Sequence, residues 1–444
     1  SRRRAGHHAG IILDSSDVLA RIEQPPVPLS VNNYGGLVVF EVGRTDIRAI
    51  VGPEARQVPV LAKAESFTKV MAGLIKEPVV AAYVDTPALL KLVDEGIKFS
   101  RNDEAAQRWP KLKTALGLEG LQQMAYTAGF DQKDWAEQAV VLAPGKRSGM
   151  VAAVLSQKPL SKQILQQAPM SSTMVFATQL DLDAMFKQIR QIAAQVEPEA
   201  AEEMEQGLAE ISKRLGFELE KDILEPMGAE WLLYASPQTA GDGILGLVLV
   251  NRLDNAAAAD SSLIKLTKQA NAALAQEMRG RGPRVQIRQH KYGNMQIHYL
   301  ATPFLSPAWA IKDGYFYAGL YPQVVAAAAN GEQAQASSIL DSEAYQAVIK
   351  RLGVKEYSSV SFVDLPKTAG DGYQILLLLS RGLMGMADMF GVDAPAMLVP
   401  PLPKLRPFLA PAGSVTWVDE RAGTIAASAP SPAPCSWAAS PGRF

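Results

Sequence analysis

The sequence predicts an α+β fold of internally repeated helix–strand–helix–hairpin units, forming mostly antiparallel sheets with helices packed on them. Three observations support this class. Apolar residues make up 48% of the 444 residues and charged residues 20%, as in a chain that folds around a core. Short apolar runs flank turns that contain glycine and aspartate, which is typical of hairpins. Finally, one stretch of the chain resembles another in its residue order.

The first third of the chain begins with residues 1–33, where prolines at positions 25, 26 and 28 predict an irregular segment. After it, continuous apolar runs predict strands, and apolar residues at helical spacing predict helices. The expected elements are strands over 37–42 and 45–51, a helix over 66–75, a strand over 79–84, a helix over 88–97, and hairpin strands over 124–129 and 139–142.

The rest of the chain follows the same pattern. A strand over 171–180 precedes a long helical region over 181–215, which Glu197-Pro198 divides into two helices. Hairpins are expected where a Gly-containing turn joins two apolar runs, most clearly at Lys312-Asp313-Gly314. The remaining elements are hairpin strands over 231–235 and 244–252, a helix over 256–278, hairpin strands over 285–288 and 295–300, strands over 309–311 and 315–319, and helices over 324–330 and 342–352.

Residues 65–87 and 343–366 share identical residues in the same order, which predicts an internal repeat. Tyr83-Val84-Asp85-Thr86-Pro87 corresponds to Phe362-Val363-Asp364-Leu365-Pro366, and a fainter third copy contains Asp181. An aspartate at the end of a strand can accept a hydrogen bond from the backbone of the next helix and cap it. We therefore interpret Asp85, Asp181 and Asp364, with Pro87 and Pro366 in the first helical turn, as structural residues that define the repeat; a shared catalytic carboxylate is the alternative.

The repeat predicts the domain organisation. After the irregular segment 1–33 we expect a first α+β unit over 34–165, a second with extra hairpins over 166–340, and a third over 341–429. Residues 430–444 form an Ala/Ser/Pro-rich tail, which is expected to be a linker or a misread reading frame.

The pattern resembles an uncharacterised bacterial family, a domain of unknown function whose members are typically exported or envelope-associated. The resemblance spans about residues 60–425 and is carried by the segments 83–87, 215–219, 222–228 and 313–319. It implies repeated α+β units and export, and it supplies no catalytic residues.

Composition and motifs exclude several function classes. Lys+Arg is 44 and Asp+Glu is 45, and this balance argues against a nucleic-acid binder. The one cysteine, Cys435, excludes a disulfide scaffold and a multi-cysteine metal site. We find no nucleophile elbow and no phosphate-binding loop, and we expect no cofactor. His290 and His298 flank a turn and could reach one ion, although exposed hairpin histidines are the simpler interpretation, so no metal site is assigned.

The segment from Ile375 to Met389 is rich in leucine and methionine. A helix that is apolar around much of its circumference is either buried in a core or faces an apolar partner. We keep both interpretations open. The second defines a candidate apolar binding face of Leu376, Leu379, Leu383, Met386 and Met389.

The sequence therefore favours a non-catalytic, exported protein with structural or binding work in the bacterial envelope, outside the cytoplasm in the periplasm or cell envelope. The basic start Ser1-Arg2-Arg3-Arg4 and the scarcity of cysteine support export, and no apolar run is long enough to span a membrane. Expected partners are envelope proteins or an apolar ligand. Two alternatives remain: a carrier of an apolar or lipid-like ligand, and a hydrolase with an unrecognised site.

Overall fold

A computed structural model describes residues 29–34, 37–42, 61–100, 102–131, 134–145, 147–239, 243–277, 285–331, 337–389, 400–419 and 424–431. The chain separates into two compact units, residues 1–68 and residues 69–444. Each is described by itself below.

The first unit contains a two-stranded antiparallel sheet. β1 (Leu29–Tyr34) pairs with β2 (Leu37–Val42), with Leu29 opposite Val42. The strand predicted over 37–42 is confirmed, and the irregular segment predicted over 1–33 is wrong at residues 29–33. Alternating polar and apolar residues after Pro28 favour an extended chain there. The strand expected over 45–51 lies outside the described residues.

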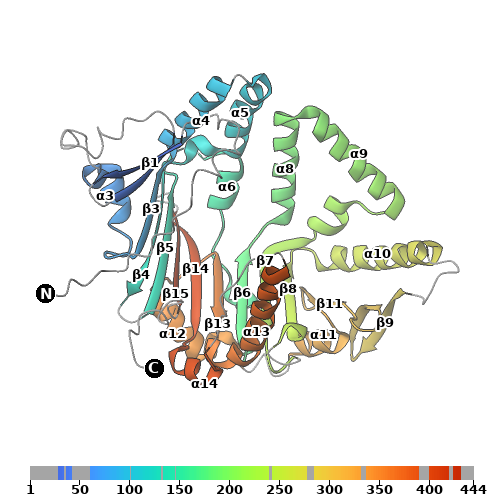
Figure 1. Ribbon diagram of the computed structural model, residues 1–444. Helices are drawn as coiled ribbons and strands as arrows, with labels where there is room; N and C mark the ends of the chain where they lie inside the picture. The colour runs from blue at the N-terminus through green and yellow to red at the C-terminus, as the bar shows by residue number, and fades with distance from the viewer. Residues whose placement is uncertain are drawn as a thin grey trace. The chain divides into compact units, whose positions relative to one another are not determined.

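The second unit is built on an antiparallel sheet, which contains thirteen strands among the residues described (Figure 1). This confirms the α+β class and the antiparallel pairing. The strand order across the sheet is β3 (Val80–Asp85), β4 (Gln123–Asp131), β5 (Asp134–Leu142), β15 (Thr424–Ser431), β14 (Ala412–Asp419), β13 (Ser359–Val363), β6 (Met174–Gln179), β7 (Met227–Ala235), β8 (Leu247–Leu253), β12 (Tyr315–Gly319), β11 (Ala308–Lys312), β10 (Met295–Ala301) and β9 (Gln286–Tyr292).

The hairpins lie where the turn residues predict them. β11 and β12 pair across Asp313 and Gly314, whose φ angles of 51° and 82° are the left-handed values that such a two-residue turn requires. β4–β5, β7–β8 and β9–β10 are the other predicted hairpins, and each forms an antiparallel pair. The strand expected over 244–252 differs in its start, because residues 244–246 form a short 3-10 helix, η5 (Ile244–Gly246).

Helices connect these strands. The long helical region divides as predicted, with α8 (Leu182–Val196) ending before Glu197 and α9 (Pro198–Leu215) beginning at the proline. Both stand out from the end of the sheet where β6 ends (Figure 1). The others are α3 (Glu65–Met71), α4 (Thr86–Ser100), α5 (Asp103–Leu116), α6 (Gly149–Leu155), α7 (Lys162–Leu165), α10 (Ala256–Glu277), α11 (Pro322–Ala329), α12 (Glu343–Leu352), α13 (Leu365–Met389) and α14 (Leu402–Leu405), with shorter turns η2 (Leu61–Lys63), η3 (Leu118–Gly120), η4 (Leu219–Leu224), η6 (Ile339–Asp341) and η7 (Arg406–Phe408).

The same element order occurs three times along the chain. A helix, a strand, two further helices and two strands follow each other from α3 to β5, from α7 to β8 and from α12 to β15. In each stretch the three strands are neighbours in the sheet, and the third triplet lies between the first two. The order agrees with a duplicated unit. The duplication itself, and the three-unit domain boundaries, stay predictions.

The main core lies on one face of the sheet. Alternate residues of the central strands point into it, including Leu232 and Tyr234 of β7 and Val248 and Val250 of β8. Buried residues of α7, α11 and α12 pack against them. No side chain of α13 that the structure describes belongs to this core, and α13 is the element that carries the predicted apolar binding face.

Candidate binding surface

The apolar run of α13 lies in solvent. Ile375, Leu376, Leu377, Leu378 and Leu379 expose 56, 42, 42, 74 and 57% of their surface. Five successive residues exceed one helical turn of about 3.6 residues, so apolar side chains project in every direction around the axis. Gln374, which precedes the run, is exposed as well.

The interpretation of this segment as a buried core helix is therefore wrong at residues 375–379. Leu376 and Leu379 of the predicted binding face are exposed, as a binding face requires. Leu383, Met386 and Met389 lie further along α13, and their side chains fall outside the described part of the structure. The leucine run alone could not separate the two interpretations, because a buried helix and an exposed apolar helix have the same composition.

A second exposed apolar side chain lies on the segment that follows α14. α14 contacts α13 and continues directly into η7, where Phe408 is 66% exposed. Lys404 and Arg406 in the same turn are also exposed. We call residues 365–389 and 400–409 together the α13 surface element. It combines exposed leucines, an exposed phenylalanine and basic side chains.

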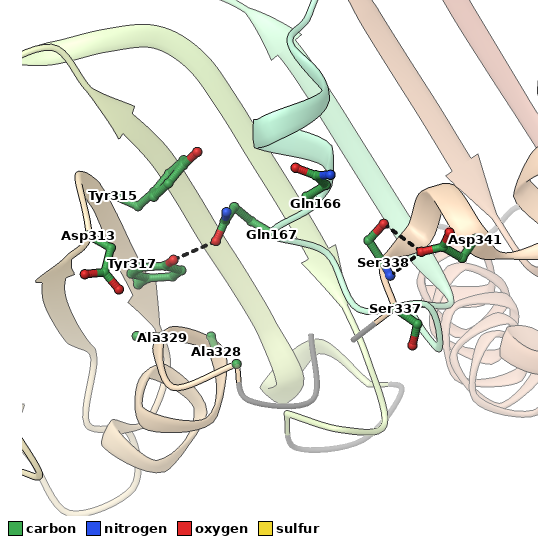
Figure 2. A pocket seen from close by; sticks show the side chains of 11 residues that line it. Gln166, Gln167, Asp313, Tyr315, Tyr317, Ala328, Ala329, Ser337, Ser338 and Asp341 are labelled. Atoms are coloured by element: carbon green, nitrogen blue, oxygen red, sulfur yellow. Dashed lines mark hydrogen bonds between the residues drawn. The ribbon is translucent and has the colours of Figure 1, made fainter. Parts of the chain in front are cut away.

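A polar cavity of about 320 Å³ lies beside β12 and α11 (Figure 2). The Tyr317 hydroxyl donates to Gln167 Oε1 at 2.8 Å, and Asp341 Oδ2 accepts from the Ser338 backbone N–H at 2.8 Å. Burial raises the pKa of the Tyr315 hydroxyl, which keeps that phenol neutral. Hydroxyl, amide and carboxylate groups converge here, so this cavity suits a polar occupant better than an apolar one.

A second cavity of about 380 Å³ lies at the end of the sheet where α8 begins. Its walls hold Met150, Val154 and Met185 together with Arg252 and Glu230. Glu230 is 2% exposed and accepts from Arg252 Nε at 2.8 Å, from the Ser161 hydroxyl at 2.8 Å and from the Ser161 backbone N–H at 2.5 Å. Sequence reasoning missed Glu230. The available signal was its spacing, since it alternates with Leu232 and Tyr234 along one strand.

The histidine pair does not converge. In the β9–β10 register His290 lies opposite Ile297, whereas His298 lies opposite Gln289, so the two side chains project from opposite faces of the sheet. His298 is also buried and stacks on Trp309 with ring centroids 5.8 Å apart. The two histidines therefore cannot share an ion, and the expectation that both are exposed is wrong for His298.

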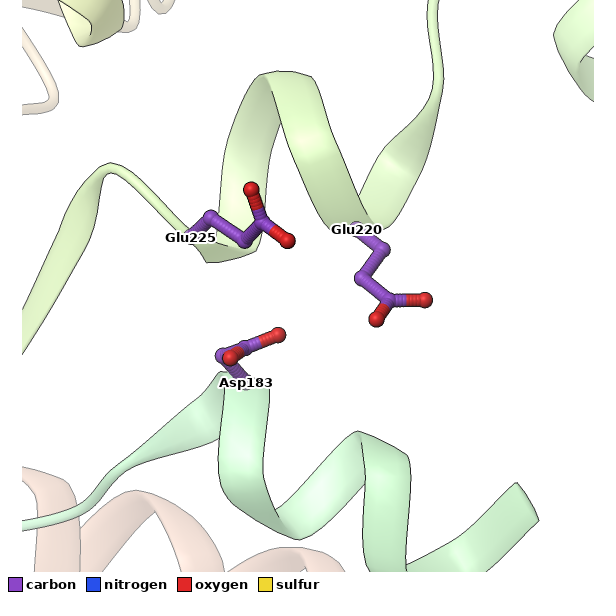
Figure 3. Close-up of side chains that lie close together, drawn as sticks. All are labelled: Asp183, Glu220 and Glu225. Atoms are coloured by element: carbon purple, nitrogen blue, oxygen red, sulfur yellow. The ribbon is translucent and has the colours of Figure 1, made fainter.

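Three carboxylates lie close together at the start of α8 and around η4 (Figure 3): Asp183, Glu220 and Glu225. The Lys187 ammonium lies 2.8 Å from Asp183, 3.5 Å from Glu220 and 3.7 Å from Glu225. Asp183 and Glu220 raise the pKa of Lys187, with the Asp183 hydrogen bond the largest cause. Arg190 also lies 2.5 Å from Glu220, so two protein cations already pair with these three carboxylates.

The strand-ending aspartates differ in what their side chains contact. Asp85 Oδ1 accepts from the Ala88 backbone N–H at 3.0 Å, and Asp181 Oδ1 accepts from Ala184 N–H at 2.8 Å, as N-cap residues do. The buried Asp364 carboxylate instead pairs with Lys367 at 2.7 Å. Pro87 and Pro366 are the second residues of α4 and α13. Their role as markers of a repeat stays a prediction.

Comparison with known families gives one match. The family model described as a protein of unknown function, DUF3352, matches residues 54–369. No curated protein and no solved structure matches this chain. Among the described residues, no helix combines the length and the hydropathy needed to cross a membrane.

Proposed function

This chain belongs to DUF3352, a family of proteins of unknown function, and from that premise we propose that it is a non-catalytic binding protein exported to the bacterial envelope. It contacts its partner through the α13 surface element. The observation that carries the proposal is the exposed run from Ile375 to Leu379.

The size of the exposed apolar surface supports a binding role. Full burial of one such side chain is worth about 1.5–3 kcal/mol, so five half-exposed ones leave on the order of 5 kcal/mol unrealised. That amount is comparable with the whole stability of a small domain, about 5–15 kcal/mol. Exposed apolar patches of this kind mark interaction sites rather than ordinary protein surface.

Export is supported by composition. The 444 residues contain one cysteine, at position 435, which suits an oxidising compartment.

The alternative function, a carrier of an apolar ligand, has less support. Such a carrier needs an enclosed apolar cavity. Both cavities described above have charged groups in their walls, Asp313 and Asp341 in one and Glu230 and Arg252 in the other. A third cavity of about 520 Å³ is lined in part by Lys76, Glu77 and Arg351. An external apolar element and polar cavities together favour contact with a partner over transport of a ligand inside the fold.

Cell fractionation tests the proposal. We expect the full-length chain in the periplasmic or membrane fraction and expect Leu378→Ser, at the most exposed position of the run, to lower the envelope-bound share. The melting temperature of this variant should stay unchanged, since the side chain packs against little. Recovery of the wild-type chain in the cytosol would contradict the proposal.

A further inference from the structure

We propose that the surface bound by the α13 surface element is an anionic lipid bilayer, into whose interface the leucine run inserts. This inference rests on the proposed function and names its partner. It assigns Ile375–Leu379 to the headgroup–acyl boundary, Phe408 to the same layer, and Lys404 and Arg406 to the lipid phosphates.

The distribution of the apolar side chains favours lipid over a protein groove. A helix that binds a groove presents an apolar stripe to the partner and a polar face to water. The run from Ile375 to Leu379 instead exposes apolar side chains around the whole axis. Acyl chains can surround such a segment, whereas a groove covers one side of it.

The length of the run fits the interface and not a span. Five helical residues extend about 7.5 Å along the axis. The hydrocarbon core of a bilayer is about 30 Å thick, so a run of this length cannot cross it. An interfacial helix lies in the plane of the membrane with its apolar side chains about 5–10 Å deep, and a short exposed run within a longer helix suits that arrangement.

The charge of the surrounding chain fits anionic headgroups. With Asp364, which pairs with Lys367, residues 364–389 and 400–409 contain four basic residues and three acidic ones, a net charge of +1, while the whole chain carries −1. Exposed Lys404 and Arg406 lie within four residues of Phe408, and residues 400–409 contain no aspartate or glutamate. Basic side chains beside an inserted aromatic ring are the pattern by which proteins bind anionic membrane surfaces.

Flotation with vesicles tests the inference on the full-length chain. The vesicles contain phosphatidylglycerol mixed with phosphatidylcholine, and pure phosphatidylcholine vesicles are the comparison. The test variant is Leu376→Ser with Leu379→Ser. The matched control is Leu89→Ser with Leu92→Ser on α4, because those leucines have the same spacing and are 44 and 65% exposed.

We expect the wild-type chain to float with the anionic vesicles and to bind the neutral vesicles more weakly. The α13 double variant should lose about tenfold or more of its lipid partitioning, because two leucine side chains leave the apolar layer. The α4 double variant should float as the wild type does, and both variants should keep the wild-type melting temperature.

Several results would overturn the inference. These are a wild-type chain that does not float, an α13 variant that floats unchanged, and an α4 variant that loses binding equally. Light scattering that shows a dimer dissociated only by the α13 substitutions would assign the surface to a second copy instead. If flotation fails while the protein still fractionates with the envelope, the bilayer is the wrong partner and the proposed function stands.

Discussion

Glu230 on β7 and Arg252 on β8 form an ion pair in which one partner is buried and the other is half-exposed. The Glu230 side chain is 2% exposed and that of Arg252 is 45% exposed, and Nε and Oε2 are 2.8 Å apart. Ser161 donates to the same carboxylate from both its backbone N–H and its hydroxyl. The carboxylate therefore joins α7 to the sheet.

Loss of the carboxylate should cost more stability than loss of the guanidinium. Glu230→Ala removes a buried carboxylate, leaves the partly buried Ser161 donors unpaired and should lower the free energy of unfolding by about 3 kcal/mol. Arg252→Ala should lower it by about 1 kcal/mol, because water reaches the half-exposed pair and Ser161 still satisfies the carboxylate. Urea unfolding of the two variants measures both values. Equal losses would contradict this ranking.

Two glycines with left-handed backbone should respond differently to alanine. Gly117 follows α5 with a φ of 75°, and Gly353 follows α12 with a φ of 71°. A Cβ at Gly117 would lie 1.9 Å from the Ser148 carbonyl oxygen, whereas a Cβ at Gly353 has no atom within 4 Å. Gly353→Ala should cost about 1 kcal/mol from backbone strain alone.

In Gly117→Ala the new Cβ also clashes with the Ser148 carbonyl oxygen, which should lower the free energy of unfolding by about 2 kcal/mol more than Gly353→Ala does. Thermal unfolding of the two variants separates backbone strain from steric clash, since Gly353→Ala has the strain without the clash. A difference close to zero would show that the chain around Ser148 moves freely.

Asn271 on α10 covers the free edge of the sheet at β9. Its side-chain amide donates to the Ile287 carbonyl at 2.8 Å and accepts from the Ile287 N–H at 2.7 Å, as a neighbouring strand would. Asn271→Ala should lower the free energy of unfolding by about 1–2 kcal/mol and speed hydrogen exchange at Ile287. Asn271→Asp, which retains the acceptor and loses the donor, is the matched control. Unchanged exchange in Asn271→Ala would contradict the role.

His298 makes stability depend on pH. Burial lowers its pKa from the ordinary value of 6.5, with nearby Asp260 opposing the shift. Between its folded and unfolded pKa values, His298 is therefore protonated in the unfolded chain and neutral in the folded chain. The free energy of unfolding should be retained above about pH 6.5 and should fall as the pH drops below it.

Unfolding free energies at about pH 7 and about pH 5 measure this slope. His298→Gln should reduce it, whereas His290→Gln changes the exposed histidine of the same hairpin and should leave it intact. An undiminished slope in His298→Gln would show that other groups cause the dependence.

Local features of the fold could be predicted from sequence because their causes are local. Pro198 fixes the start of α9, and Asp313-Gly314 supplies the left-handed residues of a hairpin turn. The placement of β15 between β5 and β14 could not be predicted, because it joins residues far apart in the chain. Such pairings depend on packing rather than on any short motif.

The same limit applies to the sites. The sequence places His290 and His298 on two strands of one hairpin, but the face of the sheet on which each side chain lies depends on the strand register, and a shift of one residue moves it to the other face. The leucine run of α13 is apolar in the sequence, but only the structure shows that these five side chains are exposed. Glu230 was overlooked because the strand was expected to begin one residue later, at Trp231.

Hydroxyl-radical footprinting of the peptide that contains Ile375–Leu379 most directly tests the claim that this run is a contact surface. In the isolated protein we expect strong side-chain labelling, and after addition of envelope membranes we expect that labelling to fall while the Leu89–Leu92 peptide of α4 stays unchanged. Weak labelling of the run in the isolated protein, or labelling that membranes do not alter, would contradict the account.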